Sequence, residues 1–255
     1  MTFQEMKQRK QEEGYSDSHI AGLSGVPVKT VQKIFEGQTE GIGYDIWKAI
    51  EDVFIDKMMV REGAVAYDSG KKQGTYTVED YWALPDERRV ELIDGYIYDM
   101  ASPTTFHQLM AGELYRQIAN YILDHRGTCT PFISPVDVQL DNDEKTMIQP
   151  DVVIVCDPKQ IIRRNILGAP DFVLEVISPG TRRRDYVVKL AKYEHARVRE
   201  YWVVDPYKKR VLVYFFEGET FPAIYPIDAE IPVNIFDGKL VLKFGQIAQW
   251  AKEGE

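Results

Sequence analysis

Two carboxylates in this sequence lie where apolar residues would be expected. Glu175 interrupts the apolar run "DFVLEVISPG", and Asp151 comes just before the apolar strand of "QPDVVIV". Burying an unpaired carboxylate is costly or forces it to take up a proton. If the two strands are neighbours, both carboxylates reach the same end of a sheet, where a hard divalent cation would relieve their repulsion. We therefore expect Asp151 and Glu175 to bind Mg²⁺ (or Mn²⁺).

A lysine should complete such a site, because a cation can position the attacking water and offset phosphate charge. In the PD-(D/E)xK nuclease motif this lysine lies two residues after the glutamate, a position that Ile177 takes here. The next helix offers a substitute, since Asp185, Lys189 and Tyr193 share one helix face at i, i+4, i+8 spacing. We expect Lys189 to fill the role, with Lys192 as its rival. The alternative is that Lys189 is a solvated helix lysine.

The sequence patterns around these residues predict a mixed sheet flanked by helices. Two short apolar runs around Asp94-Gly95 indicate a β-hairpin. Residues 105–125 form a long amphipathic pattern typical of a helix. Strands are expected in "VDVQL", "PDVVIV", the Glu175 segment, "EYWVVDP" and "VLVYFFEG", and a helix in "RRDYVVKLAKYEHARV". This order favours an α/β (α+β) fold.

The motifs resemble a known family. "ELIDG", "QPDVVIV", "FVLEVISPGTRRRD", the Lys189–Tyr193 spacing and "EYWVVDP" are similar to the Uma-two family of restriction-endonuclease-like proteins, a PD-(D/E)xK branch with a displaced lysine. The resemblance covers residues 76 to about 250. It implies a restriction-endonuclease-like fold with Glu91, Asp151, Glu175 and Lys189 as catalytic residues. His107 falls where members often carry a histidine. For Glu91 the alternative is an exposed hairpin residue, and for His107 a structural histidine at the start of a helix.

The first 60 residues predict a separate all-helical domain. Four short amphipathic segments end at glycines or polar residues. "IAGLSGVPVKTVQKIFEG" has the form of a helix-turn-helix, with a small Ala21, a turn at Gly25 and Val26 between the helices. The module resembles the Cro/C-type, lambda-repressor-like family over residues 1–54. In the DNA-binding version, the second helix enters the major groove. The residues expected to face DNA are Lys29, Thr30, Gln32 and Lys33. A packing or homodimerisation module that touches no DNA is the alternative.

Composition limits the classes of function. The net charge of −9 argues against a protein coated in nucleic acid, although it allows a local basic groove. The sequence shows no membrane-spanning run and no signal peptide, and its two cysteines, Cys129 and Cys156, lie in unrelated segments. These features favour the cytoplasm. Residues 61–75 are small and polar, so we expect a linker between domains 1–60 and 76–255.

The sequence therefore predicts a Mg²⁺-dependent DNA endonuclease targeted by its helix-turn-helix. Asp185 and Tyr193 would support Lys189. The arginines at 182–184 are expected in a solvated loop beside the site, where they could hold phosphates. "DNDEK" at 141–145 is expected to be a charged turn. Two alternatives are a DNA-binding regulator with an inert nuclease fold, and a structural or dimerisation protein.

Overall fold

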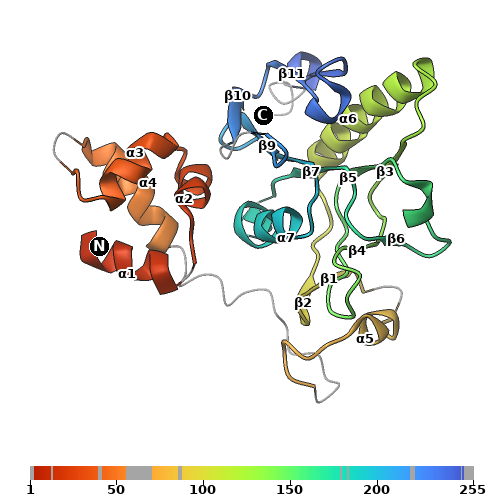
Figure 1. Cartoon of the computed structure of the whole chain (residues 1–255), viewed down its shortest axis with the longest axis horizontal. Helices are drawn as coiled ribbons and strands as arrows, with labels where there is room; N and C mark the ends of the chain where they lie inside the picture. The colour runs from red at the N-terminus through yellow and green to blue at the C-terminus, as the bar shows by residue number, and fades with distance from the viewer. Residues whose placement is uncertain are drawn as a thin grey trace. The chain divides into compact units, whose positions relative to one another are not determined.

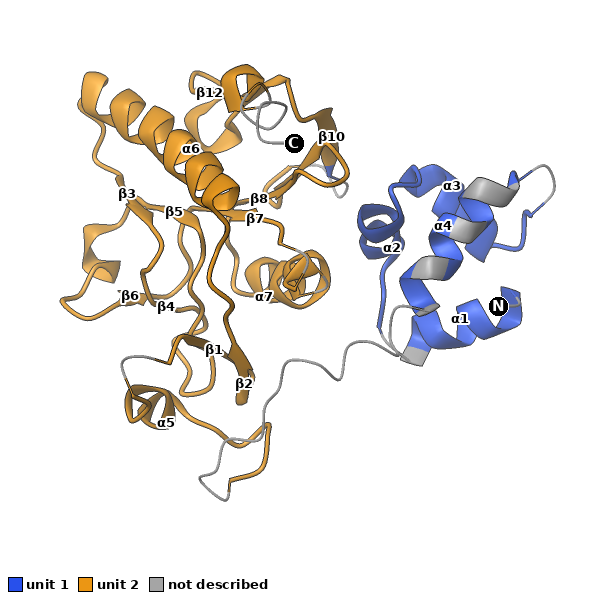
Figure 2. Ribbon diagram, turned by 180° about the vertical axis from the view of Figure 1, so that it is seen from behind, with its two compact units in different colours: residues 1–63, 220–222 blue, residues 64–219, 223–255 orange. Residues whose placement is uncertain are grey.

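The computed structural model describes residues 3–12, 14–39, 42–55, 71–85, 88–178, 180–182, 184–218, 222–247 and 249. The chain divides into two compact units, residues 1–63 with 220–222 and residues 64–219 with 223–255 (Figure 2). Of the predicted linker, residues 61–70 lie outside the described residues. Its last residues pack on the hairpin of the second unit, where the backbone N–H groups of Gly74 and Tyr76 both donate to the carbonyl of Gly95.

The described residues of the first unit contain four helices: α1 (Phe3–Glu12), α2 (Asp17–Ser24), α3 (Val28–Phe35) and α4 (Tyr44–Ile55). Ser16 caps α2 by accepting a hydrogen bond from the backbone of His19, and Gly25 ends it at φ 75°. Ala21 and Val26 are buried between the helices. The tight turn and the small residue at the crossing explain why α2 and α3 pack closely.

The second unit is built on a six-stranded mixed sheet in the order β10-β9-β8-β7-β5-β3 (Figure 1). Only β7 and β8 are parallel neighbours in it. The mixed sheet flanked by helices confirms the α+β part of the predicted fold class. Its strands are β3 (Thr130–Ile133), β5 (Val152–Val155), β7 (Phe172–Val176), β8 (Glu200–Asp205), β9 (Arg210–Phe215) and β10 (Ala223–Pro226).

Three two-stranded sheets flank the large one. The predicted hairpin about Asp94-Gly95 is β1 (Val90–Ile93) and β2 (Tyr96–Asp99), with Ile93 opposite Tyr96. Both turn residues have positive φ, and a Cβ on Gly95 would lie 2.6 Å from the backbone oxygen of Gly74. The other pairs are β4 (Val138–Gln139) with β6 (Ile166–Leu167), and β11 (Glu230–Pro232) with β12 (Val241–Lys243).

The helices cover opposite faces of the large sheet, as Figure 1 shows for α6 and α7. Alternate residues of a strand point to the same face, so Phe172, Leu174 and Val176 form one face of β7. The apolar side of α6 packs on this face. Glu175 therefore points to the other face. The helical elements of this unit are α5 (Val78–Trp82), α6 (Thr105–Asp124), a π-helix (Arg184–Lys189), α7 (Leu190–His195) and 3₁₀ turns at Pro158–Gln160 and Asn234–Phe236.

The interpretation of the cysteines was wrong. Cys129 and Cys156 form a disulfide. The strand register explains the pairing: Thr130 lies opposite Val155 in the antiparallel pair β3–β5, so the next residues outward face each other. The segments that seemed unrelated along the chain are neighbours in the sheet. Because the two cysteines are bonded to each other, they no longer support the prediction of a reducing compartment. Among the described residues, no helix has the length and apolarity needed to cross a membrane.

Candidate active site

The two predicted metal ligands lie on neighbouring antiparallel segments: Glu175 is in β7, and Asp151 immediately precedes β5. Val152 of β5 pairs with Leu174 of β7, and continuing that register by one residue brings Asp151 opposite Glu175. Directly opposite residues place their side chains on the same face of a sheet. Asp151 also accepts a hydrogen bond on Oδ2 from the backbone N–H of Val176, at 2.7 Å. The sheet itself therefore holds both carboxylates at one place.

Lys189 reaches the same place from the segment after β7. Its ammonium lies 2.8 Å from Oε1 of Glu175 and 2.7 Å from Oε1 of Glu91, and both contacts are buried. Asp185 lies 3.5 Å from the same nitrogen. Tyr193, which was expected to support Lys189, donates its hydroxyl to Oε1 of Glu175 at 2.9 Å. Lys189 is thus a buried cation shared by three carboxylates and not a solvated helix lysine.

Glu91 is part of this cluster and is not an exposed hairpin residue. Only 1% of its surface is exposed. Besides Lys189, it accepts hydrogen bonds from the backbone of Gln149 at 3.0 Å and from the guanidinium of Arg184 at 3.2 Å. We call Glu91, Asp151, Glu175, Asp185 and Lys189 the carboxylate cluster.

The helix that carries Lys189 differs from the predicted one. Residues Arg184–Lys189 form a π-helix, and only Leu190–His195 are α-helical. The prediction of one continuous α-helix over this segment was therefore wrong in its first part. The wider turn still keeps Asp185 beside Lys189, and the hydroxyl of Tyr201 on β8 supports it by donating to the Asp185 carbonyl at 2.9 Å. Short π-helical segments occur frequently at functional sites.

Burial and charge shift the pKa values in the cluster. Burial raises the pKa of Glu175 well above the usual carboxyl range, although Lys189 opposes the shift. Burial likewise raises the pKa of Asp185 to about 6 against the effect of Lys189. For Lys189, burial would lower the pKa, but Glu175, Glu91 and Asp185 outweigh it and raise the pKa above its ordinary value. Without a further cation, Lys189 therefore stays charged, and burial favours the protonated forms of Glu175 and Asp185.

His107, the predicted accessory residue, contacts Asp151. Its Nε2 lies 3.2 Å from Oδ2 of Asp151 and 3.0 Å from the carbonyl of Val176. Burial alone would lower the pKa of His107, but the hydrogen bond and charge of Asp151 outweigh burial and raise it. His107 also lies in the first turn of α6, where the side chain of Thr104 caps the helix by accepting from the His107 backbone N–H, so it has a structural position as well as a place beside the carboxylates.

Lys192 lies outside the carboxylate cluster. Its ammonium donates to Asp94 and to Asp141, in the predicted charged turn. Oxygens of Asp94, Asp141 and Asp143 lie within 4.8 Å of one another, which makes them the group of three possible metal ligands found among the described residues. The sequence did not predict this group. We call these three aspartates with Lys192 the turn cluster.

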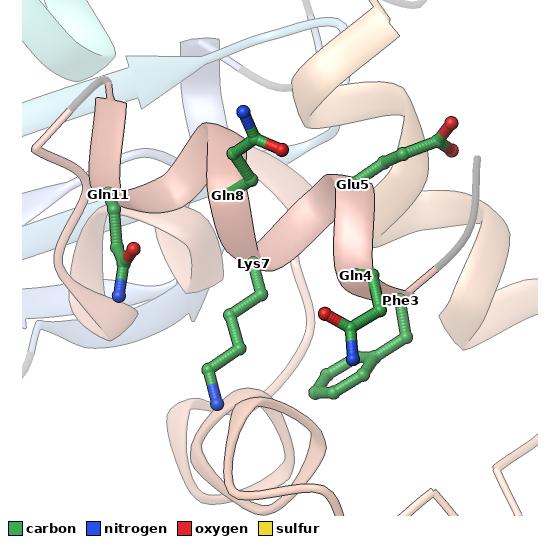
Figure 3. Close-up of a pocket in the computed structure, with 6 residues that line it drawn as sticks. All are labelled: Phe3, Gln4, Glu5, Lys7, Gln8 and Gln11. Atoms are coloured by element: carbon green, nitrogen blue, oxygen red, sulfur yellow. The ribbon is translucent and has the colours of Figure 1, made fainter.

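The DNA-facing residues proposed for the first unit lie on α3 as expected. Lys29 and Lys33 are exposed, whereas Thr30 and Gln32 are partly buried. The side chains that pack inward from the same helix are Val31, Ile34 and Phe35. A shallow hollow also lies along α1, lined by Phe3, Gln4, Glu5, Lys7, Gln8 and Gln11 (Figure 3). It is made by one helix, with one carboxylate and one ammonium among its lining residues, and carries no catalytic set.

Some residues of the site have no signal in the sequence. The prediction of a solvated arginine loop was wrong for Arg184, which starts the π-helix, is 12% exposed and donates to Glu91, while residue 183 lies outside the described residues. Tyr201, which donates to the Asp185 carbonyl, carried no signal, because a tyrosine in a strand is ordinary. Glu91 did carry a signal, because it interrupts an apolar run in the same way as Glu175.

A family model matches the part of the chain that holds this cluster. The Uma2 model, described as "Putative restriction endonuclease", matches residues 78–236. The chain belongs to the Uma2 family. All members of the carboxylate cluster, together with His107, fall inside the matched residues, whereas the four helices of the first unit precede them.

Two cyanobacterial proteins are similar to this Uma2 chain. An uncharacterized protein of Synechocystis is 29% identical over 119 residues, which cover 46% of this chain and 61% of that protein's own length. The crystal structure of a "putative nuclease" from Anabaena variabilis has a TM-score of 0.56 at 22% identity, and the match covers 69% of this chain and 98% of that one. At this identity, the structural match shows a shared fold.

Proposed function

We propose that this protein hydrolyses phosphodiester bonds in DNA with the help of a divalent metal ion, Mg²⁺ or Mn²⁺, held by Asp151 and Glu175. The observation that carries the proposal is the position of these carboxylates on adjacent antiparallel segments, with a buried lysine beside them. Family membership adds support, since the family description names restriction endonucleases.

The residues present fit a hard cation. Within the described residues, the hydrogen bonds to Glu175 fall on Oε1 and those to Asp151 fall on Oδ2, which leaves one oxygen of each for a ligand. Mg²⁺ is commonly held by one or two carboxylates and keeps water and phosphate oxygens as its other ligands. The cluster has four carboxylates against the cations Lys189 and Arg184, so a divalent ion would balance its charge.

The protein residues divide the remaining work. When bound, the metal ion would supply Lewis-acid stabilisation and activation of water. Lys189 positions the attacking water and offsets phosphate charge, and its raised pKa suits a permanent cation rather than a general base. Glu91 holds Lys189 and Arg184 in place and assists as a ligand through water. Tyr193 fixes the orientation of the Glu175 carboxylate, and Asp185 that of the ammonium.

A plasmid cleavage assay tests this proposal. We expect the wild-type protein to nick or linearise plasmid DNA with Mg²⁺ or Mn²⁺ and to stop when the metal is chelated. Glu175→Ala and the near-isosteric Glu175→Gln should both lose the activity. Cleavage that persists in both variants would contradict the assignment. An inert nuclease fold, the alternative, would show no cleavage and no Mn²⁺ binding that depends on Asp151 and Glu175.

We also propose that α2 and α3 act as a helix-turn-helix that brings the catalytic unit to DNA. The support is the exposed pair Lys29 and Lys33 on the second helix, together with a buried Ala21–Val26 crossing. The net charge of −9 makes such a local basic element useful, because the chain as a whole repels DNA.

The double variant Lys29→Glu/Lys33→Glu tests the targeting role. It should weaken duplex binding and flatten its salt dependence, since phosphate contacts release counterions. The control is Lys7→Glu on α1, which reverses the charge of one exposed lysine of the same unit and is compared with Lys29→Glu alone. Unchanged affinity in the α3 double variant, or an equal loss in Lys7→Glu and Lys29→Glu, would favour the packing or dimerisation alternative.

A further inference from the structure

A second polar group lies near the carboxylate cluster, at the turn between β8 and β9. Asp205 ends β8, is fully buried and accepts three hydrogen bonds: from the hydroxyl of Tyr186 at 2.9 Å, and from the backbone N–H groups of Tyr207 at 3.0 Å and Lys208 at 2.9 Å. These bonds fix the turn and the side chains that surround it.

Three cations gather around this carboxylate. Arg182 lies 3.5 Å from Oδ1 of Asp205, and Arg210 donates to the Tyr186 hydroxyl at 3.4 Å. The third cation, Lys208, has its pKa lowered to about 8, first by burial and then by the positive charges of Arg210 and Arg182, with Asp205 opposing. The local balance is three cations to one carboxylate, in a chain whose net charge is −9. We call Arg182, Lys208 and Arg210 the basic cluster.

The basic cluster has features that suit a phosphate oxygen. Within the described residues, Nε of Arg182 is buried without a hydrogen-bond partner. The Arg182 guanidinium lies 5.7 Å from the ring of Tyr207, and 54% of that tyrosine is exposed. Because 35% of the Arg182 side chain is exposed, the outer part of its planar guanidinium can bind phosphate, and the exposed aromatic ring gives the adjacent sugar or base a surface to contact.

Strand geometry places the basic cluster beside the carboxylate cluster. Glu175 lies opposite Val203 in the parallel pair β7–β8. Asp205 is two residues further along β8, so it points to the same face as Glu175, about 7 Å along the strand. Arg182 belongs to the loop between Glu175 and Asp185, and Tyr186 follows Asp185 in the π-helix. One nucleic-acid strand can therefore reach both clusters.

We propose that Arg182, Lys208 and Arg210 form a phosphate-binding subsite that holds the backbone of the DNA strand next to the site of cleavage. That this subsite lies next to a site of cleavage rests on the nuclease function proposed above. The contacts are to phosphate, so the subsite increases affinity and fixes the position of the strand without reading its sequence.

Binding of a labelled DNA duplex in EDTA tests the subsite separately from cleavage. The starting protein carries Lys29→Glu and Lys33→Glu, so that the N-terminal helices do not mask the effect. Adding Lys208→Ala should weaken binding and reduce the slope of log K against log salt concentration by about 1, as expected for one lost phosphate contact. Arg182→Gln should do the same. The matched control is Lys209→Ala, which removes an exposed lysine from the same turn and should change neither quantity.

The outcomes separate this inference from the nuclease proposal. If Lys208→Ala and Arg182→Gln both bind with the affinity and salt slope of their parent, or if Lys209→Ala loses as much, the subsite is wrong, whether or not Glu175 is required for cleavage. If the first two variants lose affinity and slope while the control does not, the subsite stands as a DNA contact, even if no cleavage is found.

Discussion

Lys189 and Lys192 are only three residues apart in the same helical segment, yet their side chains contact different groups. Lys189 is 3% exposed and meets three carboxylates carried by β1, β7 and the π-helix. Lys192 meets aspartates on two turns, and one of them, Asp94, is 60% exposed. The carboxylate cluster and the turn cluster therefore contain the same chemical groups but differ in burial and in the rigidity of their supports.

This difference determines what each cluster can do. Charges removed from water interact strongly and shift each other's pKa values, whereas exposed pairs are screened and contribute little. Strands hold their side chains more rigidly than turns do, and a catalytic site needs fixed geometry. In the turn cluster, the ammonium of Lys192 already donates to two of the three aspartates. For this reason the proposed metal site is the carboxylate cluster and not the turn cluster.

The largest expected effect comes from Lys189→Ala. Removing one partner of a buried ion pair destabilises a protein by about 3–5 kcal/mol, because the remaining charges stay buried. We expect a loss of that order in chemical denaturation and no detectable cleavage, while Mn²⁺ binding by calorimetry is retained because Lys189 is not a ligand. Wild-type cleavage by Lys189→Ala would show that Lys189 has no catalytic role.

An intermediate effect is expected from pH. The pKa of Asp185 is raised to about 6 by burial, so the folded state binds its proton more tightly than the unfolded state does. The contribution to stability is present below the unfolded pKa, about 4, and is lost as pH rises through about 6. Without metal, wild type should lose stability relative to Asp185→Asn between these pH values. Parallel curves for the two proteins would contradict the shift.

The smallest effect is expected from Lys192→Ala. Asp94 is 60% exposed and Asp141 is 15% exposed, so the loss of stability should be smaller than for Lys189→Ala, about 1 kcal/mol, and most cleavage activity should remain. Thermal denaturation and the plasmid assay, run in parallel with Lys189→Ala, measure both. A Lys192→Ala protein that is inactive while Lys189→Ala is active would reverse the two roles and remove the basis of the comparison.

Much of the carboxylate cluster could be predicted from sequence because its elements follow simple periodicities. An acidic residue inside an apolar strand marks Glu175, and the same rule applied to "VELIDG" marks Glu91. Helical spacing favoured Lys189 over Lys192, and the hydrogen bonds of the two lysines agree with that choice. The hairpin followed from Asp94-Gly95, since only some residues accept two successive positive φ angles.

The remaining features depend on long-range geometry. The π-helical start of the Lys189 segment is a local change of hydrogen bonding that no residue pattern in "RRDYVVK" marks. The Cys129–Cys156 bond required knowing that β3 pairs with β5, and the spacing of two cysteines does not give strand order. Asp205 looked like the end of a strand, and its partners Tyr186 and Arg182 come from another element.

The position of the metal tests the account most directly. Anomalous diffraction from a crystal of the wild-type protein soaked in Mn²⁺ would locate the ion without any assay of activity. The account predicts a peak between Asp151 and Glu175, within about 2–2.5 Å of a carboxylate oxygen of each, and loss of that peak in Glu175→Gln. A peak in the turn cluster at Asp94, Asp141 and Asp143, with none between Asp151 and Glu175, would contradict it.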